Sequence, residues 1–459
     1  MTSRFRLALV VGSLTIAFLP AGCGDSFNAG PIEYKDSERL AVDLKEKPNL
    51  QAAVRKALAD LFGPAPRSIR VPAGSGLPEG GLRLANAELD ADGKVHPLSY
   101  VDASTGETVQ VAGGYGLYRK QCLHCHGVQG AGNGPTAPFL YPRPRDYRAG
   151  IFKFTSVAPS NPKPSREDFR RTLRHGLHGT SMPAFEALMT PAEIEQVIDY
   201  VIFLSMRGEV EKNLIDEAKV ADKDDPAALD AQTVADLAAN VINNWKSVEA
   251  QVVSPTARRT PTSRESVLRG RNIFLGINTT GNKVACTDCH GAQGLGNGTS
   301  FVEKRVFDKV VFGGATIDAA IEARYREVID EERAARHKPG AAHEDESGAP
   351  SEAFEAYRNR LMTAWKPGSI DDWGNPLRPA NLNLGVYKGG RRPIDLYWRL
   401  AKGINGAKMP AHAGLLPDEQ IWDVVNFILA LPYEPDLLKD ADALKKRAAA
   451  QAPAAVTSR

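Results

Sequence analysis

Residues 122–126 read Cys-Leu-His-Cys-His, and residues 286–290 read Cys-Thr-Asp-Cys-His. In this spacing two thiols can form thioethers with the vinyl groups of one haem, while the adjacent imidazole reaches the iron. A Cys-x-x-Cys pair alone also suits a redox dithiol, and a closed zinc site needs further thiolates or histidines. The histidine directly after each pair therefore predicts two covalent c-type haems. Their attachment residues are Cys122, Cys125 and His126 for the first haem, and Cys286, Cys289 and His290 for the second.

The fifth cysteine, Cys23, follows an apparent export signal. Two arginines in residues 1–22 precede the apolar run 7–19, and Pro20-Ala21-Gly22 leads directly into Cys23. The segment resembles a bacterial lipoprotein signal, which implies lipidation of Cys23; an ordinary secretory signal cut nearby is the alternative. No later stretch approaches the ~20 apolar residues of a spanning helix. We therefore expect an exported lipoprotein that faces the periplasm and is held at the membrane by acyl chains.

Global charge predicts no particular partner. The formal net charge of +2 includes Arg4 and Arg6 of the export signal, so the remainder of the chain is neutral. Nucleic-acid binding has no support on this ground. Basic residues do gather within 141–178 and 376–408, where they either steer an acidic redox partner or form an ordinary solvated surface.

An internal repeat brings the two Cys-x-x-Cys-His motifs into register. A nearly identical glycine-rich stretch follows each motif, and both copies later carry a Gly-x-x-Met-Pro turn. The matched segments are HGVQGAGNG (126–134) with HGAQGLGNG (290–298), and HGLHGTSMPAF (175–185) with KGINGAKMPAH (402–412). The match places Met182 opposite Met409. It also pairs Arg143 with Arg378, which makes these two arginines candidates to neutralise haem propionates.

The copies differ in length but end alike. The second is longer because of a charged segment at about 301–373, rich in Glu, Arg and Ala, which we expect to be a surface insertion. Each copy then closes with an apolar stripe of helical period, and Thr190 with Glu193 offers a capping box for the first. The stripes are Ile194, Val197, Ile198 and Val201 in the first copy, and Ile421, Val424, Val425, Ile428 and Leu429 in the second.

A glycine and an aromatic residue also precede each haem motif. The pairs are Gly114 with Tyr118 and Gly270 with Phe274. Together with the Met-Pro turn and the closing helix, they resemble class I cytochrome c, and the duplication resembles a dihaem cytochrome c. The resemblance covers 104–208 and 261–433, and it implies a mainly α fold with two tandem domains.

The resemblance sets the expected domain organisation. The segments are a signal peptide at 1–22, an N-terminal extension at 23–103, a first cytochrome c domain at 104–208, a linker with a helix at 209–260, a second domain at 261–435 with the 301–373 insertion, and a disordered tail at 436–459.

The resemblance also implies the axial ligands. Its proximal ligand corresponds to His126 and His290, and its distal ligand to Met182 and Met409. The residues favour the same distal assignment independently, because each methionine sits in a Gly-x-x-Met-Pro turn instead of on an apolar helix face. Rival ligands near these turns are His175, His178 and His412, none of which falls opposite another histidine in the repeat.

Two classes of function fit this pattern. Iron held by His and Met on both sides has no open site for substrate, which favours an electron carrier among redox proteins, either a tethered shuttle or a cytochrome subunit of a membrane respiratory complex. A dihaem peroxidase-like enzyme is the alternative, and it requires one iron that opens a coordination site beside an acid-base group. The matched Met-Pro turns favour the carrier.

Overall fold

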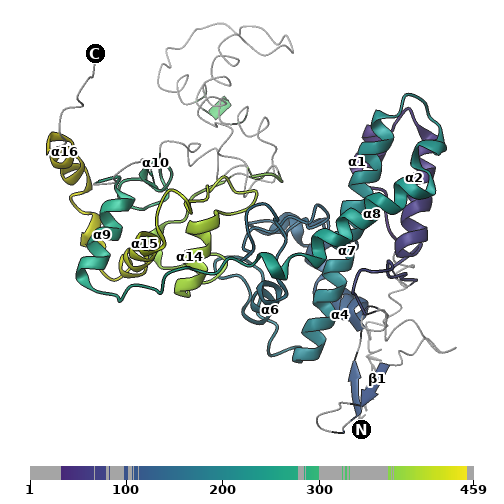
Figure 1. The fold of residues 1–459 in the computed structure, drawn as a ribbon, viewed down its shortest axis with the longest axis horizontal. Coiled ribbons are helices and arrows are strands. Elements are labelled where there is room, and N and C mark those ends of the chain that lie inside the picture. The colour runs from purple at the N-terminus through teal and green to yellow at the C-terminus, as the bar shows by residue number, and fades with distance from the viewer. Residues whose placement is uncertain are drawn as a thin grey trace, which may run out of the picture.

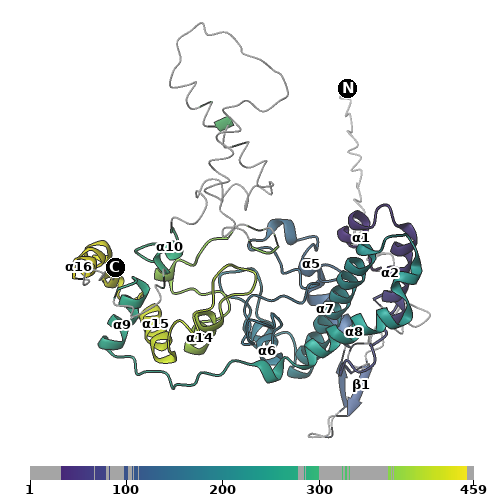
Figure 2. The same cartoon turned by 45° about the horizontal axis from the view of Figure 1, so that its top comes forward.

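The computed structural model describes residues 33–66, 68–78, 98–101, 108–111, 113–277, 286–298, 371–373 and 377–451, with a few single positions between them. Cys23 and most of the expected insertion lie outside these residues. The described chain is mainly helical, as the sequence predicts, and forms two lobes side by side (Figures 1 and 2). None of its helices is long and apolar enough to cross a membrane.

The first lobe (residues 33–252) surrounds the first haem motif. Its elements are α1 (Glu38–Asp43), α2 (Pro48–Phe62), β1 (Leu98–Val101), β2 (Thr108–Val111), α4 (Gly113–Gln121), α5 (Leu123–His126), η1 (Ala137–Phe139), α6 (Arg166–His175), α7 (Pro191–Val220), η2 (Pro226–Leu229), α8 (Ala231–Lys246) and η3 (Glu249–Gln251). Strands β1 and β2 pair antiparallel, with Leu98 opposite Val111.

Helix α7 organises this lobe. It begins with the predicted capping box, in which the Thr190 side chain accepts from the Glu193 amide and Glu193 caps Thr190 in return. It then continues for 30 residues, because the apolar residues Val210, Leu214 and Ile215 extend its buried face. Helices α2, α4, α6 and α8 all pack against it. The expected boundary at residue 208 therefore falls inside one helix, and the extension and linker share the core of the first lobe.

The second lobe (residues 253–451) surrounds the second motif. Its elements are α9 (Arg264–Phe274), α10 (Cys286–His290), η4 (Leu382–Leu384), α14 (Pro393–Lys402), α15 (Asp418–Ala430), η5 (Pro435–Leu438) and α16 (Ala441–Gln451). Helix α9 crosses α15 so closely that a Cβ atom on Gly270 would lie 2.0 Å from the carbonyl oxygen of Asp423. Only glycine fits this crossing, at which the Phe274 and Phe427 rings stand 5.3 Å apart.

The expectation of a disordered tail from residue 436 is wrong for its first part. Helix α16 forms there, and Leu437, Leu438 and Ala441 are buried in the second core. The Lys445 ammonium donates to the Thr287 hydroxyl at 2.7 Å, within the second haem motif. An adjacent leucine pair anchors this segment, although its Ala/Lys-rich composition alone indicates fraying.

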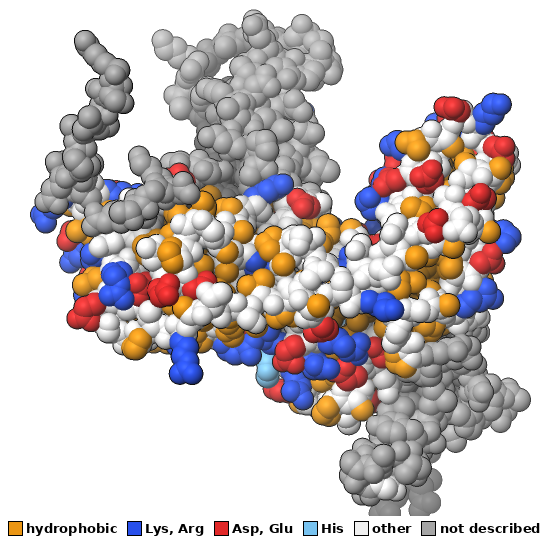
Figure 3. All heavy atoms as spheres, viewed as in Figure 1, with side chains coloured by type: hydrophobic (Ala, Val, Ile, Leu, Met, Phe, Trp, Pro, Cys, Tyr) orange, Lys and Arg blue, Asp and Glu red, His pale blue; other side chains and the backbone are white. Residues whose placement is uncertain are grey.

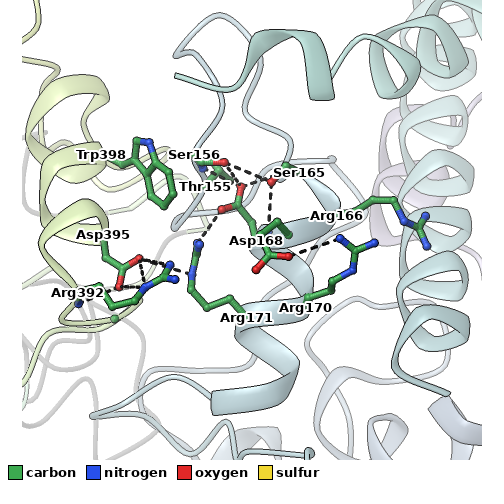
Figure 4. A network of polar contacts seen from close by, with 12 residues as sticks. Thr155, Ser156, Ser165, Arg166, Asp168, Arg170, Arg171, Arg392, Asp395 and Trp398 are labelled. Atoms are coloured by element: carbon green, nitrogen blue, oxygen red, sulfur yellow. Dashed lines mark hydrogen bonds and ion pairs between the residues drawn. The ribbon is translucent and has the colours of Figure 1, made fainter. Parts of the chain in front are cut away.

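The lobes meet where α6 faces α14 (Figure 4). The Arg171 guanidinium lies 2.6 Å from the Asp168 carboxylate on its own helix and 3.7 Å from Asp395 on α14. These three side chains are 11%, 1% and 2% exposed, so the bridge is largely shielded from water. A second contact joins the Asn405 amide to the Phe152 carbonyl oxygen at 2.8 Å.

Candidate haem-binding cavity

Each haem motif forms a short helix whose last residue is the expected proximal histidine. His126 Nδ1 lies 3.1 Å from the carbonyl oxygen of Arg145, and His290 Nδ1 lies 3.1 Å from that of Ala380. A carbonyl only accepts, so Nδ1 carries the hydrogen and Nε2 keeps the lone pair that binds iron. Burial lowers the pKa of His126 to about 4 and also lowers that of His290. Both imidazoles are therefore neutral, as iron ligation requires.

The loop after each motif repeats the same backbone contacts. The Gly132 amide donates to the His126 carbonyl at 2.9 Å, and the Gly296 amide donates to the His290 carbonyl at the same distance. Two residues further on, the Gly134 and Gly298 amides donate to the carbonyls of Cys125 and Cys289, at 3.1 Å in both lobes. The sequence match between the copies thus corresponds to matching geometry around both motifs.

The Met-Pro turns also match. The Leu177 amide donates to the Met182 carbonyl at 3.1 Å, and the Ile404 amide donates to that of Met409 at 3.1 Å. Gly176 and Gly403 begin these turns with φ of 67° and 75°. A Cβ atom on either would lie 2.5 or 2.4 Å from the methionine carbonyl oxygen, so both positions require glycine.

One cavity of about 1180 Å³ joins the two sites. All six residues of the Cys and His attachment sets line it, as do Met182 and Met409. Its volume exceeds the ~300–1,000 Å³ of a pocket for a single small ligand. Burial raises the pKa of the Cys122 and Cys286 thiols to about 12, so both remain thiols without a cofactor. The chemistry of this set, two thiols and a neutral imidazole facing a mostly apolar cavity, fits covalently bound haem.

The three rival histidines differ in whether they line the cavity. His175 and His178 are exposed and do not line the cavity. His412 is buried and lines it, with Nδ1 3.2 Å from the Leu400 carbonyl oxygen. Burial lowers the pKa of His412, so it is neutral beside the second site.

Arg143 and Arg378, the predicted propionate partners, line the cavity but are exposed. Four other cations lie deeper along the cavity wall, and the sequence places them only within the two basic stretches. They are Arg145, Lys153, Lys388 and Arg399. The internal repeat could have identified two of them, because Lys153 and Lys388 each follow a matched Gly-x-aromatic triplet.

Much of the remaining basic surface is already paired with carboxylates. Arg166 binds Glu195 and Asp199, and Arg170 binds Glu195. On the face drawn in Figure 3, Lys and Arg side chains are interspersed with Asp and Glu. This mixing favours an ordinary solvated surface over a strongly steering one.

The helical fold around the first motif, together with a family match at residues 109–201, makes this part of the chain a c-type cytochrome domain. The matching family is described as cytochrome c oxidase, cbb3-type, subunit III. A domain of this class binds haem c covalently and transfers electrons.

No curated protein matches the chain significantly. Among solved structures, a chain of the Kuenenia stuttgartiensis reducing HAO-like protein complex aligns with 69% of this chain and 93% of its own length. The two are 20% identical, with a TM-score of 0.39.

Proposed function

We propose that this chain is an exported dihaem cytochrome c that carries electrons between redox proteins. The observation that supports it most is the matched pair of sites: each lobe ties a haem-motif histidine to a backbone carbonyl and aims a Met-Pro turn at the same cavity. On this proposal the two lobes are tandem cytochrome c domains. His126 with Met182 would hold one haem iron, and His290 with Met409 would hold the other.

A closed coordination shell makes the protein a carrier. Haem supplies the one-electron redox couple, and Met/His ligation raises its reduction potential. The protein's own part is to hold both axial side chains in place and to exclude water with the apolar cavity wall. A peroxidase-like enzyme would instead need an iron that opens. Buried His412 is the acid-base group that this alternative would use at the second site.

The test begins with haem content. The denatured protein should exceed its polypeptide mass by two haem groups, and the reduced protein should bind carbon monoxide poorly. Met182→Ala and Met409→Ala should each open one iron to carbon monoxide and lower the potential of that haem alone, on the order of 0.1 V within the ~0.8 V range that axial ligands set.

Met189→Ala is the matched control, because Met189 is buried in the first core and does not line the cavity. It should leave both spectra unchanged. Rapid peroxide turnover by the unmodified protein would support the enzyme instead, and its loss in His412→Gln would locate the activity at the second site.

The proposed setting is the periplasmic face of a membrane, with lipid on Cys23 as the anchor and redox proteins as partners. The support is the signal-like sequence before Cys23, which precedes the described residues. Cys23→Ser should release the protein from membranes after a high-salt wash. Equally firm binding by that variant would rule out the lipid anchor.

A further inference from the structure

Equivalent residues of the two lobes meet each other at the interface. In the repeat, Arg171 matches Trp398 and Phe154 matches Gly389. The Arg171 guanidinium lies 5.3 Å from the centre of the Trp398 ring system, and a Cβ atom on Gly389 would lie 2.5 Å from the Phe154 ring. A residue meets its own equivalent only near a two-fold axis, so the lobes are related by an approximate two-fold rotation that passes between these pairs.

Lys153 and Lys388 are a third equivalent pair, and both line the shared cavity. Burial lowers the pKa of both ammonium groups, and the positive charge of Lys153 lowers the pKa of Lys388 further. Lys153 binds the Asp371 carboxylate at 2.8 Å. The Lys388 ammonium lies over the face of the Tyr141 ring, 5.4 Å from its centre, which compensates a partly buried cation more weakly than a carboxylate does.

Two arginines extend this pair along the cavity wall. Arg145 stacks 3.5 Å from the centre of the Trp373 ring system, and Arg399 donates to the Gly390 carbonyl. Burial lowers the pKa of each to about 10. Altogether seven Lys and Arg side chains but only two carboxylates, Asp168 and Asp371, are among the cavity-lining residues that the structure describes.

Arg143, Arg378 and Lys408 are exposed, but the other four cations are partly buried beside only these two carboxylates. Partly buried positive charge in such excess is costly unless anions enter the cavity. Each haem carries two propionate carboxylates, which are anions of the required kind. We propose that Lys153, Lys388, Arg145 and Arg399 form one counter-charge cluster that binds propionates of both haems at the two-fold axis. This inference rests on the proposed function, and it adds that the two haems share their electrostatic environment.

A shared cluster has a measurable consequence. A nearby cation favours the reduced haem, because reduction adds negative charge. Removal of one cluster cation should therefore lower the potentials of both haems. Lys388 is the cleanest position, since removal of Lys153 would also leave Asp371 buried without its ammonium partner.

The experiment is a spectroelectrochemical titration of the haem-loaded Lys388→Met protein, with haem content first measured by mass. At a fixed potential, the ratio of reduced to oxidised haem should fall about tenfold at both haems, or ~59 mV for a one-electron couple. Lys388→Arg, which keeps the charge, should stay within about twofold of the unmodified protein. Lys388→Gln provides a second neutral variant if the Met variant does not mature.

Arg391→Gln is the matched control, because it removes an exposed cation three positions away that contacts Tyr433 outside the cavity. It should move neither potential by more than about twofold. A shift at one haem alone, or an equal shift in Arg391→Gln, overturns the shared cluster while the dihaem function stands. A single haem by mass sinks the proposed function, and this inference with it.

Discussion

The two lobes have the same haem-motif geometry, but different side chains pack behind the motif in each. In the first lobe the Tyr147 hydroxyl donates to that of Tyr118 at 2.6 Å, and Tyr118 donates to the Gly127 carbonyl at 2.7 Å. The second lobe has Leu382 and Phe274 at these positions, and there the Tyr387 hydroxyl donates to backbone carbonyls instead. The backbone bonds around the motifs are nevertheless the same.

The surroundings of the lobes differ as well. The first core takes in α1, α2 and α8, whereas the second is closed by α16. The comparison teaches that both sites share their glycine turns and main-chain hydrogen bonds, whereas the buried side chains behind them differ between the lobes.

The largest effect should come from removing one attachment pair. Cys122→Ala with Cys125→Ala should delete the first haem and leave the second with its own spectrum, because each motif is held by contacts within its lobe. Mass spectrometry and absorbance check this. The reciprocal Cys286→Ala with Cys289→Ala variant is the control. Loss of both haems from either variant would show that the lobes mature as one unit.

The next largest effect should come from removing Arg171, which bridges the two lobes. Arg171→Met should cost about 3–5 kcal/mol, because it leaves the buried Asp168 carboxylate without its ion-pair partner. Chemical denaturation should then show the lobes unfolding in separate steps. Arg392→Met is the control, because Arg392 binds the same Asp395 but its side chain is 53% exposed, and it should cost about 1 kcal/mol or less. Equal costs would mean that Arg171 does not couple the lobes.

The smallest effect should come from exchanging the aromatic side chains behind the haem motifs. Tyr147→Phe should cost about 1 kcal/mol, because one buried hydrogen bond is lost. Phe274→Tyr should cost about 1–3 kcal/mol, because it places a hydroxyl among apolar neighbours of the second core. Thermal unfolding of the haem-loaded variants measures both. A stabilised Phe274→Tyr protein would show that the second lobe already offers the hydroxyl a partner.

The short-range features were predictable from sequence. Helical spacing and caps located the closing helices, and the Gly-aromatic pair located the α9–α15 crossing at Gly270, because these signals lie within a few residues of each other. The matched motifs and Met-Pro turns also indicated which residues line the cavity.

Long-range packing was not predictable in this way. Nothing local indicates that α7 continues past residue 208 into the packing of α2 and α8, or that Leu437 and Leu438 anchor α16. The merging of two sites into one cavity likewise depends on how Arg171 and Asp395 join the lobes. Propensity and period carry no information on such contacts between distant segments.

The approximate two-fold axis has a consequence for how this interface can vary. In a symmetric pair of identical chains, a residue on the axis meets only its twin, so every substitution there is made twice. Joining both copies in one polypeptide removes that restriction. Arg171 can face Trp398, and Phe154 can face Gly389, which are combinations of unlike side chains that no homodimer can place across its axis.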